Sequence, residues 1–431
     1  PLTEMTEVGP ARLPGLPSFQ LDRARLDEQL LATAGGEGCE VLRPARIVEV
    51  EHGWPTSRVR IETGEGERQV TARWVIDGSG RHAFLARRRR LRRRVEEHPV
   101  AAAWARWRGV RDLDGIQVQG GDPHASRLPP IIAARRLATN HFCGYGWWCW
   151  MIPLAGGQTS VGLVYDKTLF ELPGQGAVEE RYRDFVRSQA GLRELLETAT
   201  MEEDDFLAYR HLPYRSTQYM DRGWALLGDA AAFIDPYYSP GLDHASISIY
   251  ATARLVERQL AGQLENEALT AAVEEHNGRF VRSYGRWLEA LYQGKYELMG
   301  DAELTECAFV VDTALYHLGV VTPVYRDLEN LAHPLFGLES PQSVYAYRFM
   351  RTFNRRLRDL ARLRRHSGTY GRRNAGHRSL VQPFGLGTGA ALAHLYRGLR
   401  LWLGLEIRQG LERLRRGRPD ISKPVPAVAP P

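Results

Sequence analysis

Residues 223 to 262 combine a short strand, a loop and a helix, and their residue types could bind a polar or anionic ligand. The apolar run from Trp224 to Leu227 ends at Gly228-Asp229, where a carboxylate could accept hydrogen bonds from sugar-like hydroxyls. The run from Leu242 to Leu260 is amphipathic at helical spacing, and the first turn of a helix offers free N–H groups to an electron-rich ligand. The loop between them contains Pro236, Pro240 and Gly241. An ordinary strand–loop–helix connection has the same pattern, and Gly-Asp alone does not decide between the two.

A second glycine-rich turn lies at Asp77 to Arg81, which reads D-G-S-G-R and, with Ala83, formally matches G-x-G-x-x-A. A primary dinucleotide loop needs a helix next and then a parallel strand, with an acidic residue about 20 positions further on. An arginine run from Arg87 to Arg94 follows instead, and no better G-x-G-x-x-G exists in the chain. We therefore do not interpret this turn as the primary phosphate loop.

Two tryptophans occur on a predicted strand from Gly144 to Leu154. Trp148 and Trp150 share one face of that strand with Ile152, because side chains alternate along a strand. A turn at residues 155–157 and a returning strand from Gln158 to Tyr165 predict a hairpin. On spacing alone, packing in the core is the preferred interpretation of the tryptophans.

The N-terminal elements must position the D-G-S-G-R turn. Residues 1–18 read as a proline-containing loop, and Leu21 to Ala34 as a helix with Asp22 as N-cap. Its face carries Leu26, Leu30 and Leu31, and glycines follow it. The predicted strands, of which the last two form a hairpin, are Cys39 to Leu42, Ala45 to Glu51, Arg58 to Glu62 and Gln69 to Ile76.

The remaining pattern is β-rich up to about residue 165 and mainly helical from about residue 266 onward. Helices are predicted at Glu179 to Ala199 and Ala390 to Arg416, a strand at Phe206 to Pro213, a loop at Ser367 to Gly387, and a proline-rich tail at Ser422 to Pro431. The basic helix at Ala390 to Arg416 could lie on a membrane surface, but packing on the protein body or a partner is the preferred interpretation. These patterns suggest four segments: 1–85, 86–212, 213–265 and 266–431.

Composition bounds the class of protein. The 431 residues are 43% hydrophobic, which is enough for a sizeable core, and no uninterrupted apolar run approaches 20 residues. The net charge is +6, but arginine dominates, with lysine only at Lys167, Lys295 and Lys423, so we infer no nucleic-acid partner. We expect no metal site and a reducing, cytoplasmic location, because no metal or disulfide spacing connects the cysteines, Cys39, Cys143, Cys149 and Cys307.

Separated segments together resemble the glutathione-reductase-like flavoprotein monooxygenases. Trp224 to Gly241 is similar to their second flavin motif, Leu21 to Leu31 to the helix after their first nucleotide-binding unit, and Asp77 to Arg81 to their D-[GA]-S-G-R segment. Within that superfamily the chain resembles the flavin-dependent, tryptophan-halogenase-like group. Trp148 to Pro153 fits W-x-W-x-I-P, and Phe233 to Gly241 fits F-x-x-P-x-x-S-x-G.

The resemblance implies an α/β (α+β) fold: a glutathione-reductase-like FAD-binding domain, N-terminally incomplete, a mixed β-sheet substrate domain and a helical C-terminal region. It implies FAD, reduced by a separate flavin reductase and used with oxygen and halide to halogenate an aromatic or carrier-tethered molecule. The implied catalytic residues are Trp148, Trp150 and Ser239, with halide at Ser239 and Gly241. The implied FAD contacts are Asp77, Gly78, Gly80, Arg81, Gly228, Asp229, Pro236, Gly241 and Leu242.

Four departures from the family pattern keep alternatives open. The chain begins at Pro1 without a G-x-G-x-x-G unit, so we expect a start further upstream, and the relay lysine of the family has no counterpart before Leu21. Pro240 lacks an N–H that a halide could use, and Tyr238 replaces the glutamate of the tryptophan halogenases. A phenolic, pyrrolic or tethered substrate is therefore favoured over free tryptophan. The alternatives are a monooxygenase, a geranylgeranyl-reductase-like enzyme, or a non-catalytic flavoprotein fragment.

Overall fold

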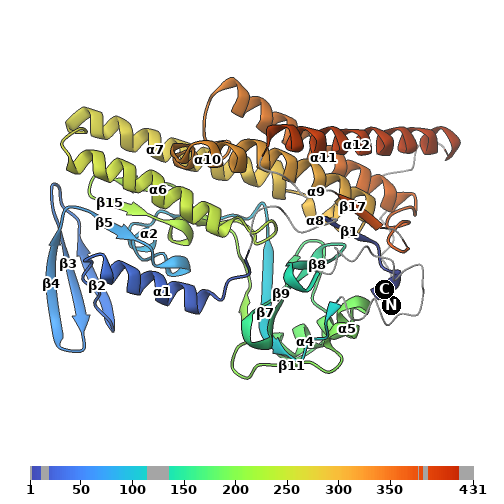
Figure 1. Ribbon diagram of the computed structural model, residues 1–431, viewed down its shortest axis with the longest axis horizontal. Coiled ribbons are helices and arrows are strands. Elements are labelled where there is room, and N and C mark those ends of the chain that lie inside the picture. Colours follow the sequence, from blue (N-terminus) through green and yellow to red (C-terminus); the bar gives the residue numbers. More distant parts are fainter. Residues whose placement is uncertain (1, 11–18, 114–134, 377, 382–386, 417–431) are drawn as a thin grey trace.

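The computed structural model describes residues 2–10, 19–113, 135–376, 378–381 and 387–416. Helices from residue 240 onward form a layer along the top of the molecule in Figure 1. Below this layer lie two separate sheet regions, one with α1 and β2 to β5 and one with β7 to β10. The arrangement is a mixed α/β fold, as the sequence predicts.

The first sheet region begins with α1 (Arg23–Gly36), and the Asp22 carboxylate caps it by accepting from Ala24 N. An antiparallel sheet follows, formed by β2 (Ala45–Glu51), β3 (Ser57–Thr63) and β4 (Gly66–Ala72). The helix, its cap and the β3–β4 hairpin confirm the prediction. The strand predicted at Cys39 to Leu42 is wrong, because these residues have no strand partner.

The predicted strand from Gln69 to Ile76 is in fact two strands in two sheets. The chain leaves the hairpin after β4, and β5 (Val75–Asp77) then pairs in parallel with β15 (Trp224–Leu226). This parallel pair brings the Asp77 turn beside Gly228-Asp229, although the two lie far apart in the sequence. Antiparallel β14 (Met220–Asp221) completes the sheet.

The Asp77 turn leads into a short helix, α2 (Phe84–Arg88), and then β6 (Arg92–Arg94). Because β6 pairs antiparallel with β13 (Tyr214–Ser216), no parallel βαβ unit follows the glycine-rich turn. This agrees with the sequence argument against a primary phosphate loop there. A third short strand, β16 (Ala232–Phe233), joins β13 on its other side.

The second sheet region is antiparallel, with strands in the order β11-β7-β10-β9-β8. The strands are β7 (Val100–Arg108), β8 (Asn140–Gly144), β9 (Trp147–Pro153), β10 (Gln158–Asp166), β11 (Thr200–Met201) and β12 (Leu207–Tyr209), which also pairs with β7. The β9–β10 hairpin confirms the prediction, although β9 starts at Trp147 rather than Gly144. Of the strand predicted at Phe206 to Pro213, only β12 is present. The helix predicted at Glu179 to Ala199 is two helices, α4 (Val178–Ser188) and α5 (Ala190–Leu196), separated at Gln189.

The helical layer starts at Pro240, two residues before the predicted start at Leu242. Its helices are α6 (Pro240–Leu260), α7 (Asn266–Trp287), α8 (Lys295–Leu298), α9 (Ala302–Tyr316), α10 (Thr322–Arg326), α11 (Pro341–His366) and α12 (Thr388–Arg416). Two π-helical turns, Leu288–Tyr292 and His317–Val321, interrupt the layer, and such turns are frequent at functional sites. The predominantly helical prediction is confirmed.

Two loop predictions are wrong in part. Strand β1 (Glu7–Pro10), within the predicted loop 1–18, pairs in parallel with β17 (Arg378–Val381), within the predicted loop at Ser367 to Gly387. Four-residue strands carry too little pattern to be recognised in isolation. The proline-rich tail at Ser422 to Pro431 lies outside the described residues.

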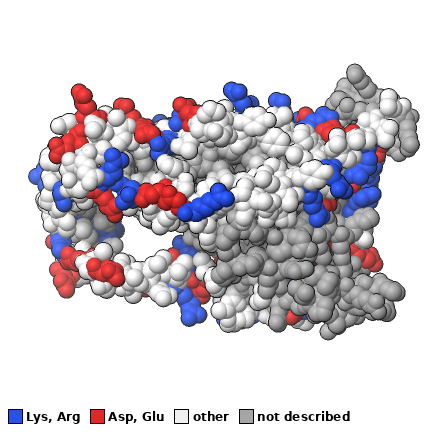
Figure 2. All heavy atoms as spheres, turned by 45° about the horizontal axis from the view of Figure 1, so that its top comes forward, with Lys and Arg blue, Asp and Glu red and all other residues white. Residues whose placement is uncertain are grey.

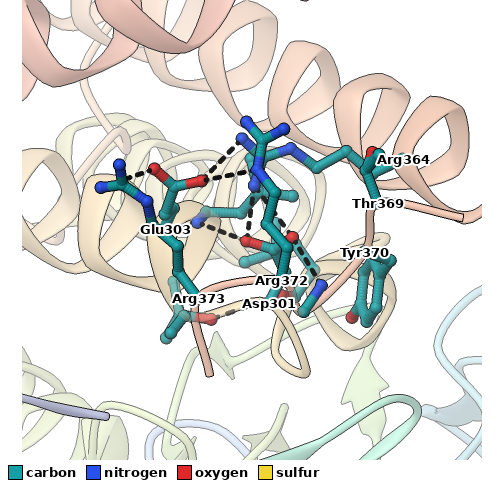
Figure 3. A network of polar contacts seen from close by, with 12 residues as sticks. Asp301, Glu303, Arg364, Thr369, Tyr370, Arg372 and Arg373 are labelled. Atoms are coloured by element: carbon teal, nitrogen blue, oxygen red, sulfur yellow. Dashed lines mark hydrogen bonds and ion pairs between the residues drawn. The ribbon is translucent and has the colours of Figure 1, made fainter. Parts of the chain in front are cut away.

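The last helix, α12, packs against α9 and α11, as the preferred sequence interpretation has it. Leu395, Trp402 and Leu405 join a core cluster with residues of those two helices. Figure 3 shows the polar network beside this contact, in which Glu303 at the start of α9 meets arginines from several segments. Their side chains come from α11, the following loop and α12: Arg364, Arg372, Arg373 and Arg408.

By length and mean hydropathy alone, one helical stretch of the described chain, Ala302–Arg326, could cross a membrane. In this fold it is a core element, and its Asp312 is paired with buried Lys295. Basic and acidic side chains are interspersed among the described residues on the face shown in Figure 2.

Candidate functional site

A cavity of about 640 Å³ lies where the two sheet regions and the helical layer meet. Ten of the twelve predicted site residues line it: Gly78, Gly80, Trp148, Trp150, Gly228, Asp229, Pro236, Ser239, Gly241 and Leu242. They come from the β5 turn, from β9, from the β15–α6 loop and from the first turn of α6. The structure therefore brings together three motifs that the sequence separates.

The backbone on one side of the cavity leaves room for a ligand. A Cβ added at Gly78, Gly80 or Gly241 would meet no atom within 4 Å. Asp229 is half-buried, and its carboxylate has no hydrogen-bond partner within the described parts of the chain. Burial raises the pKa of Asp229, while Arg81 and Arg23 oppose that shift. This side offers space and one carboxylate acceptor to a ligand that carries hydroxyls, and these residues fit the hydroxyl-bearing part of a flavin cofactor.

Two predicted FAD contacts, Asp77 and Arg81, do not line the cavity. The Asp77 carboxylate accepts hydrogen bonds from the N–H groups of Ser79 (2.9 Å) and Leu85 (2.7 Å), so it shapes the turn. The Arg81 guanidinium lies over the ring of Tyr209, at 4.3 Å from its centroid, and donates to the Leu212 carbonyl. Both residues hold the glycine turn in place, and a direct contact of either with FAD stays a prediction.

The Trp148 side chain is fixed by a buried hydrogen-bonded chain. Its Nε1 donates to the Tyr296 hydroxyl (3.0 Å), which in turn donates to Asp235 Oδ2 (2.8 Å). His98 Nε2 lies 2.7 Å from the same oxygen, and Asp235 Oδ1 accepts from Tyr237 N. Trp148 is only 1% exposed, so it is a fixed wall between the sheet and the β15–α6 loop.

Trp150 is held differently, against its own sheet. Its Nε1 donates to Ser160 Oγ on the neighbouring strand (3.0 Å). Gly162 lies opposite Trp150 in β10, and a Cβ there would lie 2.1 Å from the indole ring. Only glycine leaves space for this ring position, which explains a glycine inside a strand. That glycine is a signal that the sequence analysis did not use.

The loop before α6 has a strained backbone, and side chains of other elements hold it in place. Tyr238 (φ 69°) and Ser239 (φ 53°) are consecutive left-handed residues, a costly conformation for a bulky side chain. The Tyr238 hydroxyl donates to Asp312 Oδ2 (2.9 Å). The same carboxylate binds Lys295 Nζ at 2.6 Å, and Asn354 bridges the pair.

Four tyrosines of the helical layer anchor this loop and the first turn of α6. Tyr284 donates to the Phe233 carbonyl, Tyr292 to the Tyr237 carbonyl, Tyr296 to Asp235 and Tyr316 to Asp243. Burial raises the pKa of all four hydroxyls, so they remain protonated donors at neutral pH. The sequence analysis found no role for residues 266–431, and the structure shows them fixing the loop that carries the predicted halide site.

The anion-binding capacity of that loop is limited. Ser239 N donates to the Pro236 carbonyl (2.9 Å), and Pro240 has no N–H. The remaining donors are the N–H groups of Gly241 and Leu242 in the first turn of α6 and the Ser239 hydroxyl, which makes no capping bond. The helix dipole adds a partial positive charge at this point.

No lysine lines the cavity in the part of the chain that the structure describes. Lys167 lies near the surface and donates to the Arg210 carbonyl, and Lys295 is 2% exposed and paired with Asp312. A titratable side chain that the sequence analysis missed, His141, does open on the cavity between the rings of Trp148 and Tyr237.

The comparisons with known structures identify the fold first. The chain superposes on halogenase PltM in complex with phloroglucinol and FAD with a TM-score of 0.65 at 17% identity, covering 97% of this chain and 82% of that one. The flavin-dependent halogenase CmlS matches with a TM-score of 0.56 at 18% identity, over 92% and 64% of the two chains. The fold is that of FAD-dependent halogenases.

The sequence then identifies the family. The family model for tryptophan halogenase matches residues 15–291, and this chain belongs to that family. Sulochrin halogenase of Aspergillus terreus is 25% identical over 303 residues, which is 64% of this chain and 52% of that protein. The 1H-pyrrole-2-carbonyl-[peptidyl-carrier protein] chlorinase of Pseudomonas fluorescens is 26% identical over 62% of this chain and 56% of the chlorinase. The chain thus spans about half the length of the curated relatives that it matches.

Proposed function

We propose that this chain uses reduced FAD and oxygen to halogenate an electron-rich aromatic or carrier-tethered substrate. The observation that carries the proposal is that Trp148, Trp150, Ser239 and Asp229 line one cavity. FAD, when bound, supplies the redox chemistry with oxygen. The protein's own residues bind, orient and exclude water, as follows.

Asp229 accepts hydrogen bonds from hydroxyls of the cofactor, and the first turn of α6 faces its electron-rich edge. Trp148 and Trp150 separate the cofactor side of the cavity from the aromatic substrate. The halide is held by Gly241 N, Leu242 N and Ser239 Oγ. The motif allows one more N–H donor, which is missing here because position 240 is proline. The reductant comes from a separate flavin reductase, as the family resemblance implies.

The substrate is a phenol, a pyrrole or a carrier-bound ring rather than free tryptophan. Aromatic rings dominate the wall near Trp148, and Tyr238, where the tryptophan halogenases have glutamate, is bound to Asp312. Phloroglucinol in PltM and the carrier-bound pyrrole named for the Pseudomonas chlorinase are substrates of this kind. We also keep the cytoplasm as the proposed location.

The pyrophosphate half of FAD needs a partner surface that the described residues do not supply. Strand β5 pairs only with β15 within the described chain, so its other edge is open. Helix α1 buries no residue, and Leu30 is 58% exposed. We propose that a nucleotide-binding unit outside the described residues covers this edge. Without such a unit, the alternative of a non-catalytic flavoprotein fragment holds.

A second candidate activity, hydroxylation without halide, is favoured by Pro240, which removes one N–H from the predicted halide site. A reductase of the geranylgeranyl type would share the same cavity. Incubation with chemically reduced FAD, oxygen and bromide, against a panel of phenols and pyrroles, separates these activities by mass spectrometry. Brominated product supports halogenation, whereas hydroxylated product without any brominated product would establish the monooxygenase.

A further inference from the structure

The outer face of α12 is an exposed apolar stripe. At 100° per residue its large apolar side chains fall within an arc of about 100°, on the side turned away from the core face. Each is at least 50% exposed: Leu392, Tyr396, Leu403, Ile407, Leu411 and Leu414. The stripe extends over about 33 Å at 1.5 Å per residue. Exposed apolar patches of this extent mark interaction surfaces.

The charges around the stripe are one-sided. Arg400 is exposed within the stripe. Arg397 and Arg408 flank it with side chains 40% and 43% exposed, and they pair with Glu306 and Glu303 of α9, whose side chains are only 16% and 10% exposed. The only carboxylates of α12, Glu406 and Glu412, are turned toward the protein and paired with arginines. The exposed face of α12 therefore offers apolar and positively charged groups and no free carboxylate.

A second copy of this helix would not match these charges. Two such faces packed together would bring the exposed Arg400 of each copy into an apolar interface to which α12 contributes no exposed carboxylate. An anionic lipid surface supplies both complements: acyl chains for the apolar side chains and phosphate groups for the arginines. Near the start of α12, where Arg326 binds Thr388, Tyr325 and Leu328 add two more exposed apolar side chains.

We propose that α12 binds the surface of a membrane containing anionic lipids, with its outer face in the interface and its inner face on α9 and α11. The helix lies along the surface and does not cross it. This assignment does not depend on the proposed halogenase activity. It unites the two interpretations of α12 from the sequence, since each face of the helix has its own partner.

Vesicle co-sedimentation of the full chain tests the proposal. The probes are vesicles of phosphatidylcholine with about one third phosphatidylglycerol, and vesicles of phosphatidylcholine alone. We expect binding to the anionic vesicles that weakens with added salt, because surface charges are screened. Leu403→Glu/Ile407→Glu should reduce the partition coefficient at least about tenfold, since two apolar anchors become anions. Arg400→Gln should reduce it about fivefold, at about 1 kcal/mol per basic residue.

The matched control is Leu30→Glu/Leu31→Glu, which makes the same change on the exposed face of another helix and should bind as the wild type. Circular dichroism and thermal unfolding check that each variant folds. If Leu403→Glu/Ile407→Glu does not fold, Arg400→Gln still tests the proposal. Equal binding to neutral vesicles, or no binding to anionic ones, overturns the proposal. Light scattering gives a further outcome that overturns the proposal. If the wild type is a dimer and Leu403→Glu/Ile407→Glu is a monomer, the stripe is an interface between two copies of the chain.

Discussion

The two sides of the cavity differ in construction. On the helical side, buried tyrosines and the Lys295–Asp312 pair hold the loop from Phe233 to Asp243. On the N-terminal side, α1 has no buried residue and β5 has one open edge within the described chain. The helical side is therefore preorganised by the chain itself, whereas the N-terminal side leaves a helix face and a strand edge uncovered within the described chain. Groups that are already in position need no reorganisation energy during a reaction. An open side gives a large cofactor room to enter.

The strongest test of this difference is the buried ion pair on the helical side. Asp312→Ala leaves the Lys295 ammonium, the Tyr238 hydroxyl and Asn354 without their shared carboxylate. We expect a loss of about 3–5 kcal/mol in the free energy of unfolding, because an uncompensated buried charge remains. Urea denaturation measures it.

The N-terminal sheet provides the matched control for that experiment. Glu51→Ala breaks a surface pair with Arg58 in which both side chains are more than half exposed, and should cost less than about 1 kcal/mol. Lys295→Met/Asp312→Leu should recover most of the loss, since an apolar pair replaces the ions. If Asp312→Ala and Glu51→Ala lower the free energy of unfolding equally, the two sides of the cavity do not differ in how firmly the chain holds them.

The second prediction concerns the pH dependence of the helical side. Burial, with a smaller effect of Arg279, lowers the pKa of His276 on α7 to about 4. The folded state therefore favours the neutral ring, and this stability is complete above pH 6.5 and lost as the pH falls from 6.5 toward 4. The loss amounts to at most about 3 kcal/mol.

Urea midpoints at pH 7.5 and pH 5 measure this effect. His276→Leu should reduce the pH dependence by its own share, because His244, whose pKa burial also lowers to about 4, still contributes. The same substitution at exposed His82 should not change the pH dependence. If the wild type and His276→Leu lose stability in parallel on acidification, burial of His276 does not contribute.

The sequence was most informative where a pattern is local. Alternation placed Trp148, Trp150 and Ile152 on one face, and helical spacing located α6 to within two residues. The motif residues of the cavity followed from the family resemblance. Arg81 shows the limit of this approach: the motif gives its identity, but rings from β12, β13 and β16 determine where its side chain points.

The helical side could not be predicted in the same way. The tyrosines that anchor the loop lie 51 to 73 residues from their acceptors, and nothing in their own surroundings marks them as donors rather than core residues. The role of Gly162 could have been predicted, because a glycine inside a strand indicates that another group lies close to the backbone there. The β1–β17 pair joins segments at the two ends of the chain, a contact that only the tertiary structure reveals.

A smaller effect is expected on the cofactor side. Asp229→Asn should weaken FAD binding about tenfold, since a charged acceptor of hydroxyl hydrogen bonds becomes neutral. Flavin fluorescence titration measures the dissociation constant. Asp221→Asn, a nearby carboxylate that binds Arg222 N and does not line the cavity, should leave it unchanged. An unaltered affinity of Asp229→Asn would mean that this carboxylate is not a cofactor contact.

The smallest expected effect lies where the two sides meet, at the start of α6. Pro240→Ala adds one N–H to the first turn beside Gly241 and Ser239. Because this donor faces a solvated cavity, we expect an ordinary hydrogen bond of about 0.5–1.5 kcal/mol, which lowers the KM for bromide about three- to tenfold. Pro341→Ala makes the same change at the first residue of α11, away from the cavity, and should have no effect on bromide. A KM that does not respond to Pro240→Ala would place the halide elsewhere in the cavity, and the tyrosine-anchored loop would then serve the aromatic substrate rather than the anion.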